Sequence, residues 1–156
     1  MVVVADTSPI NYLILIGEID LLQRLYKRVL IPPAVFAELT HPRAPAPVRT
    51  WASDAPKWLE VLSPTADVVA PQLDPGESAA IALAIEIDAD VLLIDEQSGR
   101  REAVRRGVKV AGTLSVLDEA DRAGFVDFIQ AVSQVRKAGF RVSQAVVNEI
   151  ILRRAQ

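Results

Sequence analysis

The sequence VVVADTSP at residues 2–9 decides the fold class. Val2–Ala5 is an apolar and mostly β-branched run without polar alternation, which is typical of a strand covered on both faces. Asp6 ends this run, and Ser8 and Pro9 then suit the N-cap and the first turn of a helix. The stretch therefore predicts a buried strand that ends in a carboxylate and leads directly into a helix.

Short apolar segments alternate with helical patterns along the rest of the chain. Further strands are expected at residues 28–31, 58–62, 91–94 and 108–110. Helices are expected at residues 9–17, 18–26, 33–39, 48–53, 74–87, 97–106, 114–122, 126–138 and 143–154. Because strands alternate with helices and no Asn-Gly hairpin signal occurs, we predict an α/β fold with a central parallel sheet, formed by residues 1–156 as one domain.

The composition limits the chemistry that this chain can perform. Of its 156 residues, 51% are hydrophobic and 24% are charged, so the chain is globular rather than disordered. Seventeen Lys and Arg residues against 20 Asp and Glu residues give a net charge of −3, which disfavours a generally basic nucleic-acid-binding module. The absence of Cys and the single His exclude disulfides, thiolate zinc sites, cysteine nucleophiles and paired-histidine catalysis. The chemistry must therefore depend largely on carboxylates.

The apolar segments also bear on where the protein works. All of them are far shorter than the ~20 residues that a membrane span needs. No basic region precedes the first apolar run, which Asp6 interrupts, so no signal peptide is indicated. We expect a cytoplasmic protein without a membrane partner.

Four acidic residues are candidates for one site. Asp6 and Asp95 each follow a buried strand, and the carboxyl ends of parallel strands share one edge of a sheet. Glu77 begins a helix whose next turns are apolar, so its side chain should point toward the interior. Glu38 lies near the end of its helix, where the helix dipole opposes a negative charge unless something positive compensates it. The alternative is structural: Asp6 and Asp95 suit helix caps, and Glu77 completes a capping box with Asp74.

Taken together, these carboxylates predict a metal site. Carboxylates a few ångströms apart repel each other, and a hard divalent cation removes that repulsion. Mg²⁺ or Mn²⁺ is the cation that a set of oxygen ligands favours. Such a cation polarises a phosphoryl oxygen and activates water without Cys, His or Lys, so the hydrolysis of phosphodiesters fits the composition.

Five segments resemble, in their order and spacing, those of PIN domains. They are VVVADTSP at 2–9, IPPAVFAE at 31–38, LDPGESAAIALA at 73–84, ADVLLIDE at 89–96 and VAGTL at 110–114. They cover essentially the whole chain. The opening Asp-Thr-Ser-Pro is most similar to a branch of uncharacterised PIN-like proteins that is often grouped with VapC-like toxins.

The resemblance implies a three-layer α/β/α PIN-like fold and a Mg²⁺- or Mn²⁺-dependent endoribonuclease that hydrolyses RNA phosphodiesters. It also implies a homodimer and a toxin of a type II toxin–antitoxin pair, silenced by a cognate antitoxin protein. PIN domains typically carry Thr two positions before the second strand-end Asp, where this chain has Leu93, and Ser98 or Glu96 could substitute for the missing hydroxyl. The catalytic and metal-binding residues implied are Asp6, Glu38, Glu77 and Asp95.

Three small polar residues are candidate substrate-binding residues near the acids. Ser8 and Asn11 lie in the first turns of the first helix, and Thr113 follows the last strand at another carboxyl end. Each could contact a phosphate or a metal ligand. Helix capping is the alternative for Ser8 and Thr113, and a solvated helix start for Asn11.

Two arginines complete the candidate substrate-binding set. Arg101 and Arg105 are one turn apart on one helix face, which suits an RNA backbone. The alternative is an ordinary solvated, salt-bridged face, because Glu102 can pair with Arg106 at i,i+4.

Other enzyme classes lack the residues that they need. A haloacid-dehalogenase-type phosphatase requires a second Asp where Ser8 stands, and a receiver domain requires paired acids near its start and a late Lys. No dinucleotide-binding or Walker loop occurs. The alternative that stays open is a catalytically idle PIN-like domain that binds RNA or a protein.

Overall fold

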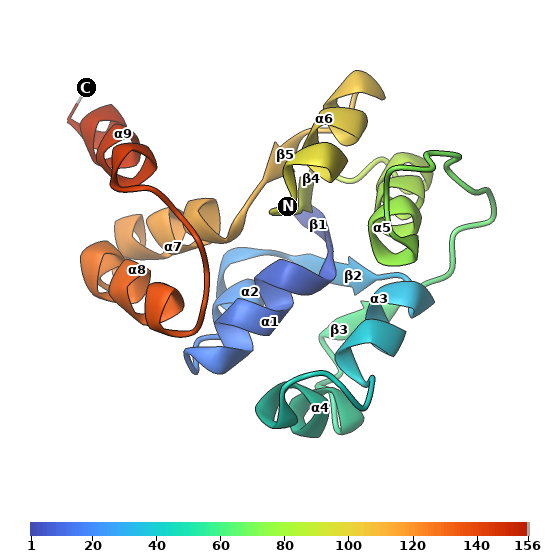
Figure 1. The fold of residues 1–156 in the computed structure, drawn as a ribbon, viewed down its shortest axis with the longest axis horizontal. Coiled ribbons are helices and arrows are strands. Elements are labelled where there is room, and N and C mark those ends of the chain that lie inside the picture. Colours follow the sequence, from blue (N-terminus) through green and yellow to red (C-terminus); the bar gives the residue numbers. More distant parts are fainter. Residues whose placement is uncertain (156) are drawn as a thin grey trace.

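A five-stranded parallel sheet forms the centre of the molecule (Figure 1). The computed structural model describes residues 1–155. The strands lie in the order β3-β2-β1-β4-β5, and each neighbouring pair is parallel, so the predicted α/β fold with a central parallel sheet is confirmed. The strands are β1 (Val2–Ala5), β2 (Arg28–Ile31), β3 (Leu59–Val61), β4 (Val91–Leu93) and β5 (Val110–Ala111).

The helices occupy nearly the positions that the sequence predicts. They are α1 (Thr7–Leu15), α2 (Leu21–Leu25), α3 (Pro33–Leu39), α4 (Ala46–Ser53), α5 (Pro75–Glu86), α6 (Gln97–Arg105), α7 (Thr113–Arg122), α8 (Phe128–Lys137) and α9 (Gln144–Arg154). The second helix is shorter than predicted, because Gly17 (φ +74°) ends the first helix and a turn occupies the residues before Leu21. The last strand begins later than predicted, because pairing with β4 starts at Val110.

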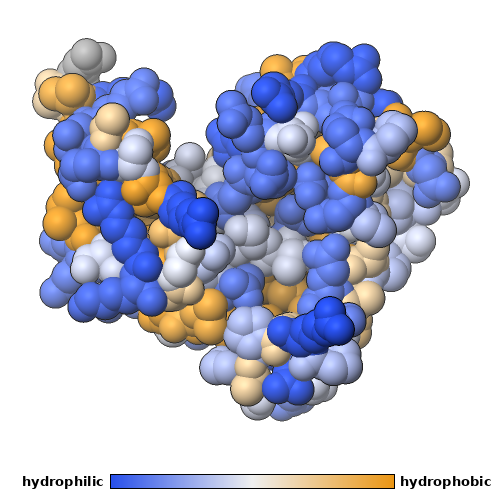
Figure 2. All heavy atoms as spheres, viewed as in Figure 1, coloured by the Kyte–Doolittle hydropathy of each residue, from blue (hydrophilic) through white to orange (hydrophobic). Residues whose placement is uncertain are grey.

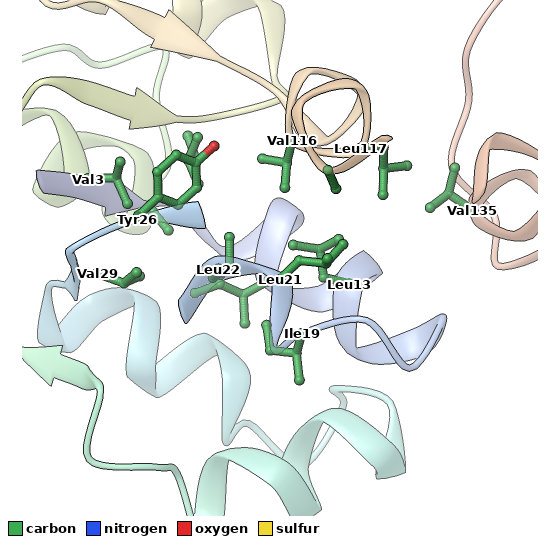
Figure 3. Packing of buried hydrophobic residues seen from close by; sticks show 14 of the residues in the cluster. Val3, Leu13, Ile19, Leu21, Leu22, Tyr26, Val29, Val116, Leu117 and Val135 are labelled. Atoms are coloured by element: carbon green, nitrogen blue, oxygen red, sulfur yellow. The ribbon is translucent and has the colours of Figure 1, made fainter. Parts of the chain in front are cut away.

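The two faces of the sheet bury different sets of side chains, since successive strand residues point in opposite directions. Val3 and Ala5 face the larger apolar cluster, which includes residues of α1, α2, α7 and α8. Figure 3 shows Val116 and Leu117 of α7 pointing toward the side chains of α1 and α2. Val4 faces the smaller cluster, which is built mainly on α5. Helices therefore cover both faces, as in a three-layer α/β/α arrangement.

The strand order reverses direction next to β1. The chain adds β2 and β3 on one side of β1, and then crosses over to add β4 and β5 on the other side. In α/β sheets, ligands bind outside the carboxyl ends of the strands at such a switch point. Ala5 is aligned with Leu93 across this point, and the Asp6 N–H donates to the Leu93 carbonyl at 2.8 Å. The fold therefore places Asp6 and Asp95 at one crevice.

Candidate active site

Asp6 lies at the carboxyl end of the central strand and is 5% exposed. It occupies the N-cap position of α1, but its side chain makes no capping hydrogen bond. Its Oδ1 atom is buried without a hydrogen-bond partner in the described part of the chain. The capping alternative for Asp6 therefore does not account for its carboxylate.

Asp95 is anchored by three donors. Ser8 Oγ donates to its Oδ2 at 2.7 Å, and Thr113 Oγ1 donates to the same oxygen at 2.6 Å. The Thr113 N–H donates to Oδ1 at 2.7 Å. Gly112 leaves the space for this contact, because a Cβ there would lie 2.7 Å from Asp95 Oδ1. Ser8 is thus not the N-cap that its position suggested, because its hydroxyl binds a carboxylate 87 positions away.

The hydroxyls of Ser8 and Thr113 also bear on position 93, where this chain has Leu and PIN domains typically have Thr. The Leu93 side chain is fully buried in the larger apolar cluster. Ser8 and Thr113, rather than Ser98 or Glu96, supply hydroxyls to Asp95. Glu96 instead caps α6 by accepting from the Ser98 N–H.

Glu38 and Glu77 approach the same crevice from α3 and α5, which pack against each other. Thr7 Oγ1 donates to Glu38 Oε2, and a Cβ at Gly76 would lie 2.8 Å from Glu38 Cδ. Asp74 caps α5 by accepting from the Glu77 N–H at 2.8 Å, as the capping-box pattern predicts. This cap uses the backbone of Glu77 and not its carboxylate, whose Oε2 atom is buried without a partner among the described residues.

The electrostatics show that these carboxylates share one environment. Burial first, and then the charges of Asp74, Glu38 and Asp95, raise the pKa of Asp6 from 3.8 to about 7. The pKa of Glu77 is raised from 4.5 to about 8, mainly by burial and also by its neighbours Asp74, Asp6 and Glu96. The pKa of Glu38 is raised by burial and by the nearby charge of Asp74. All four predicted acids therefore lie close enough to interact through Asp6.

The donor set fits a hard divalent cation. Within residues 1–155, no group of three or more Asp, Glu, His or Cys side chains is arranged to hold a metal ion as the side chains stand. The cluster nevertheless offers only carboxylate oxygens, which Mg²⁺ and Mn²⁺ favour. Two of these oxygens, Asp6 Oδ1 and Glu77 Oε2, are buried and unbonded, a costly state that a cation would relieve.

The remaining predicted residues lie outside this cluster. Asn11 is half-buried on α1, and Arg101 is exposed on α6. Arg105 pairs with the buried Glu102 at 2.5 Å, and Arg106 pairs with it at 2.8 Å. The i,i+4 pairing of Glu102 with Arg106 is therefore confirmed.

Thr7 was expected to donate a hydrogen bond to a metal ligand or a phosphate, and it donates to Glu38. Two other contributions to the site were not predicted: the charge of Asp74 raises the pKa of Asp6 and Glu77, and Arg100 Nη1 donates to the Ile94 carbonyl at 2.9 Å beside Asp95. Asp74 stands three positions before Glu77, so its position was a usable signal. Arg100 gave none, because the sequence presents it as one of several equivalent surface arginines.

Comparisons with known proteins assign the chain to a family. The model of the family DUF3368, described as a PIN domain, matches residues 2–156. A similar fold occurs in a PilT N-terminus domain protein from the hyperthermophilic archaeon Sulfolobus solfataricus P2, with a TM-score of 0.56 and 19% sequence identity, over 77% of this chain and 93% of that chain. No curated protein matches. In the described part of the chain, no helix has the length and apolarity to cross a membrane. Because the family match extends over nearly all residues, this chain belongs to the PIN-domain family.

Proposed function

We propose that residues 1–156 form a single-domain endoribonuclease that depends on Mg²⁺ or Mn²⁺ and hydrolyses RNA phosphodiesters. PIN domains are typically nucleases that bind divalent metals. The observation that carries the proposal is the meeting of four carboxylates at the switch point, two of them with buried, unbonded oxygens. A purely structural cluster would use those oxygens in hydrogen bonds. The residues that would hold the metal and support catalysis are Asp6, Glu38, Glu77 and Asp95.

The chain's own residues would orient these ligands. When bound, the cation supplies Lewis-acid polarisation of a phosphoryl oxygen and acidifies water. Ser8 and Thr113 hold the Asp95 carboxylate in one orientation, and Thr7 holds Glu38. Without metal, burial and neighbouring acids raise the pKa of Glu77 to about 8, so metal binding near neutral pH would release a proton from its carboxyl group.

The substrate contacts belong to the same proposal. Ser8 and Thr113, which bind Asp95, and Asn11 of α1 would contact a phosphate of the substrate. Arg101 and Arg105 lie on α6 and would contact the RNA backbone beyond the acids. Because these two contacts are electrostatic, we expect RNA affinity to fall steeply as salt rises.

The decisive experiment is cleavage of structured RNA with and without Mn²⁺. We expect internal cleavage that requires the metal and that Asp6→Ala and Asp95→Ala each reduce by roughly 10²-fold or more. Asp20→Asn is the matched control, because Asp20 is exposed and makes no side-chain capping bond. Cleavage that survives chelation, or survives both substitutions, would contradict the proposal.

The biological role proposed is that of a cytoplasmic, homodimeric toxin of a type II pair, silenced by a cognate antitoxin. Expression of the wild-type protein should then arrest growth, and co-expression of the product of a small adjacent gene should relieve the arrest. Asp6→Ala should be harmless at equal protein level. Harmless expression of an enzyme that cleaves RNA in vitro would remove the toxin role and leave the nuclease in place.

A catalytically idle PIN-like domain is the second candidate, favoured by the absence of a preformed three-ligand group within residues 1–155. A metal titration separates the two candidates. A ligand bound by the native state alone raises the melting temperature, so the nuclease should be stabilised by Mg²⁺ or Mn²⁺. An unchanged melting temperature would favour the idle domain.

A further inference from the structure

We propose that the cleft between α9 and the carboxyl ends of β4 and β5 binds one nucleotide of the RNA strand, next to the phosphodiester that is cut. This inference rests on the proposed nuclease function and names a part of its substrate site. The cleft has a volume of about 280 Å³, and Asp95 is part of its lining, so it opens directly onto the carboxylate cluster. Figure 2 shows the surface hollowed between the C-terminal helices and the lobe that carries α6.

One wall of the cleft presents a fixed cation. Arg100 is half-buried, and its Nη1 atom donates to the Ile94 carbonyl at 2.9 Å. A Cβ at Gly112 would lie 3.1 Å from this nitrogen and 2.7 Å from Asp95 Oδ1, so the cation and the carboxylate flank the same glycine. Among the described residues, Arg100 forms no salt bridge, although Asp95 lies near its guanidinium. With Asp95 bound to the proposed metal, this guanidinium would be available to a phosphate beside the cluster.

The opposite wall is largely apolar. Phe140, Val142, Val146 and Ile150 line it, and the Phe140 ring is held edge-on against Tyr12 with 5.0 Å between ring centroids. Val146 is 42% exposed, so this wall is open to solvent. An apolar wall that includes an aromatic ring is suited to the stacking of an unpaired base.

The rim of the cleft carries a second cation. Arg153 is 67% exposed in its side chain and pairs with Glu149 at 3.2 Å, also within α9. The lining therefore carries two cations, Arg100 and Arg153, and two carboxylates, Asp95 and Glu149. An apolar wall that faces a guanidinium matches a base and its phosphate, once the proposed metal neutralises Asp95. The volume, near the lower end of the roughly 300–1,000 Å³ typical of small-ligand pockets, fits a single nucleotide better than a helix of a partner protein.

The test measures binding separately from cleavage. All variants carry Asp6→Asn, so that RNA stays intact, and the affinity for a fluorescein-labelled single-stranded RNA is measured by anisotropy in Mg²⁺. Arg100→Gln should weaken binding by about tenfold, because it removes a charged hydrogen bond. Arg28→Gln is the matched control, since Arg28 is exposed and lies at the amino end of β2, away from the carboxyl ends of the strands.

Two substitutions of opposite charge at Val146 test the cleft while leaving Arg100 unchanged. Val146→Glu should weaken RNA binding by about tenfold, and Val146→Lys should preserve or strengthen it, because the sign of the added charge decides the interaction with a phosphate. Ile129→Glu is the control, since Ile129 is 57% exposed on α8 and does not line this cleft. A purely structural effect would weaken binding equally in both Val146 variants.

The outcomes separate this inference from the nuclease proposal. Unchanged RNA affinity in both Arg100→Gln and Val146→Glu overturns the nucleotide subsite. Cleavage by the wild-type enzyme decides the nuclease function independently, because the binding assay uses the Asp6→Asn background.

Discussion

Asp6 occupies a helix N-cap position without acting as a cap. Its carboxylate is buried, its Oδ1 atom has no partner among the described residues, and its pKa is raised to about 7 by desolvation first and by neighbouring carboxylates second. Burying an unpaired carboxylate costs stability, and strongly perturbed acids of this kind concentrate at functional sites. The residue is therefore better explained by a ligand than by the local backbone.

Replacing Asp6 should separate stability from function. Without metal, Asp6→Asn should melt at the same temperature as the wild type or a few degrees higher, because the substitution removes a buried charge. The stabilisation by Mn²⁺ should disappear in the variant. Differential scanning calorimetry with EDTA and with Mn²⁺ measures both effects. An Asp6→Asn protein that Mn²⁺ still stabilises fully would show that Asp6 is no ligand.

The raised pKa values of Asp6 and Glu77 predict how stability depends on pH. Both acids bind protons more tightly in the folded protein than at their ordinary values of 3.8 and 4.5, so their contribution to stability is present at low pH. It is fully present below about pH 4 and is lost as the pH rises to about 7 for Asp6 and about 8 for Glu77. In EDTA, the melting temperature should therefore fall from about pH 4 to about pH 8 and level off above that.

Two controls sharpen the pH experiment. Saturating Mg²⁺ should flatten the decline, because a bound cation favours the charged carboxylates. The double variant Asp6→Asn and Glu77→Gln should flatten it without metal. A decline that persists unchanged in the double variant would locate the titrating groups elsewhere.

At the scale of elements, two carboxylates of the site lie close against glycines, where a Cβ would displace them. Gly76 lies in the first turn of α5, against the Glu38 carboxylate of α3, and Gly112 lies against Asp95 at the start of α7. Each glycine lets a helix start reach a carboxylate that belongs to another element. The contacts that position the starts of α5 and α7 therefore also position the carboxylates of Glu38 and Asp95.

Gly76→Ala should leave the stability of the metal-free protein intact but lower its affinity for the metal. Alanine is favoured over glycine by about 1 kcal/mol inside a helix, so the metal-free protein should not lose stability through the backbone. The new Cβ would lie 2.8 Å from Glu38 Cδ and displace that carboxylate, so the affinity for Mn²⁺ should fall by roughly 10- to 100-fold. A calorimetric Mn²⁺ titration measures the change. The shorter side chain of Glu38→Asp should partly restore affinity in the double variant, and an unchanged affinity in Gly76→Ala would exclude Glu38 as a ligand.

The strands and their terminal acids could be predicted because each signal is local. An apolar run followed by an acid is visible at Asp6 and at Asp95, and the capping box at Asp74 is contained in four residues. The partner of Ser8 could not be predicted, since its hydroxyl binds Asp95 across the sheet instead of the helix start beside it. Likewise, the sequence does not distinguish Arg100 from its neighbours. Only the packing of α6 brings that one guanidinium to the Ile94 carbonyl.

At the scale of the molecule, α9 is attached lightly. Val147 is its only buried residue, and Arg154 links it to α7 through Asp118 and Asp121. The Arg154 guanidinium also lies over the Phe128 ring, 4.8 Å from its centroid. Since α9 forms one wall of the proposed nucleotide cleft, these contacts control the width of the cleft.

Arg154→Met should loosen α9 without unfolding the protein. The change removes partly exposed ion pairs of about 1 kcal/mol or less each, so the melting temperature should fall by only a few degrees. Hydrogen exchange should accelerate within residues 144–154 and remain unchanged in the sheet. Arg153→Met is the control, because among residues 1–155 Arg153 pairs only with Glu149 of the same helix. Equal exchange rates in α9 of the wild type and Arg154→Met would show that the helix is held by other contacts.

The central strand is also the first element of the chain, which has a practical consequence for handling the protein. The Val2 N–H donates to Asp90 at 2.7 Å and the Met1 carbonyl accepts from the Lys27 N–H at 2.8 Å, so the chain starts at the amino edge of the sheet. An affinity tag or a surface linker attached ahead of Met1 emerges on the side remote from the carboxylates and leaves the crevice free for long nucleic acids. Immobilised assays should therefore be anchored through the first residue.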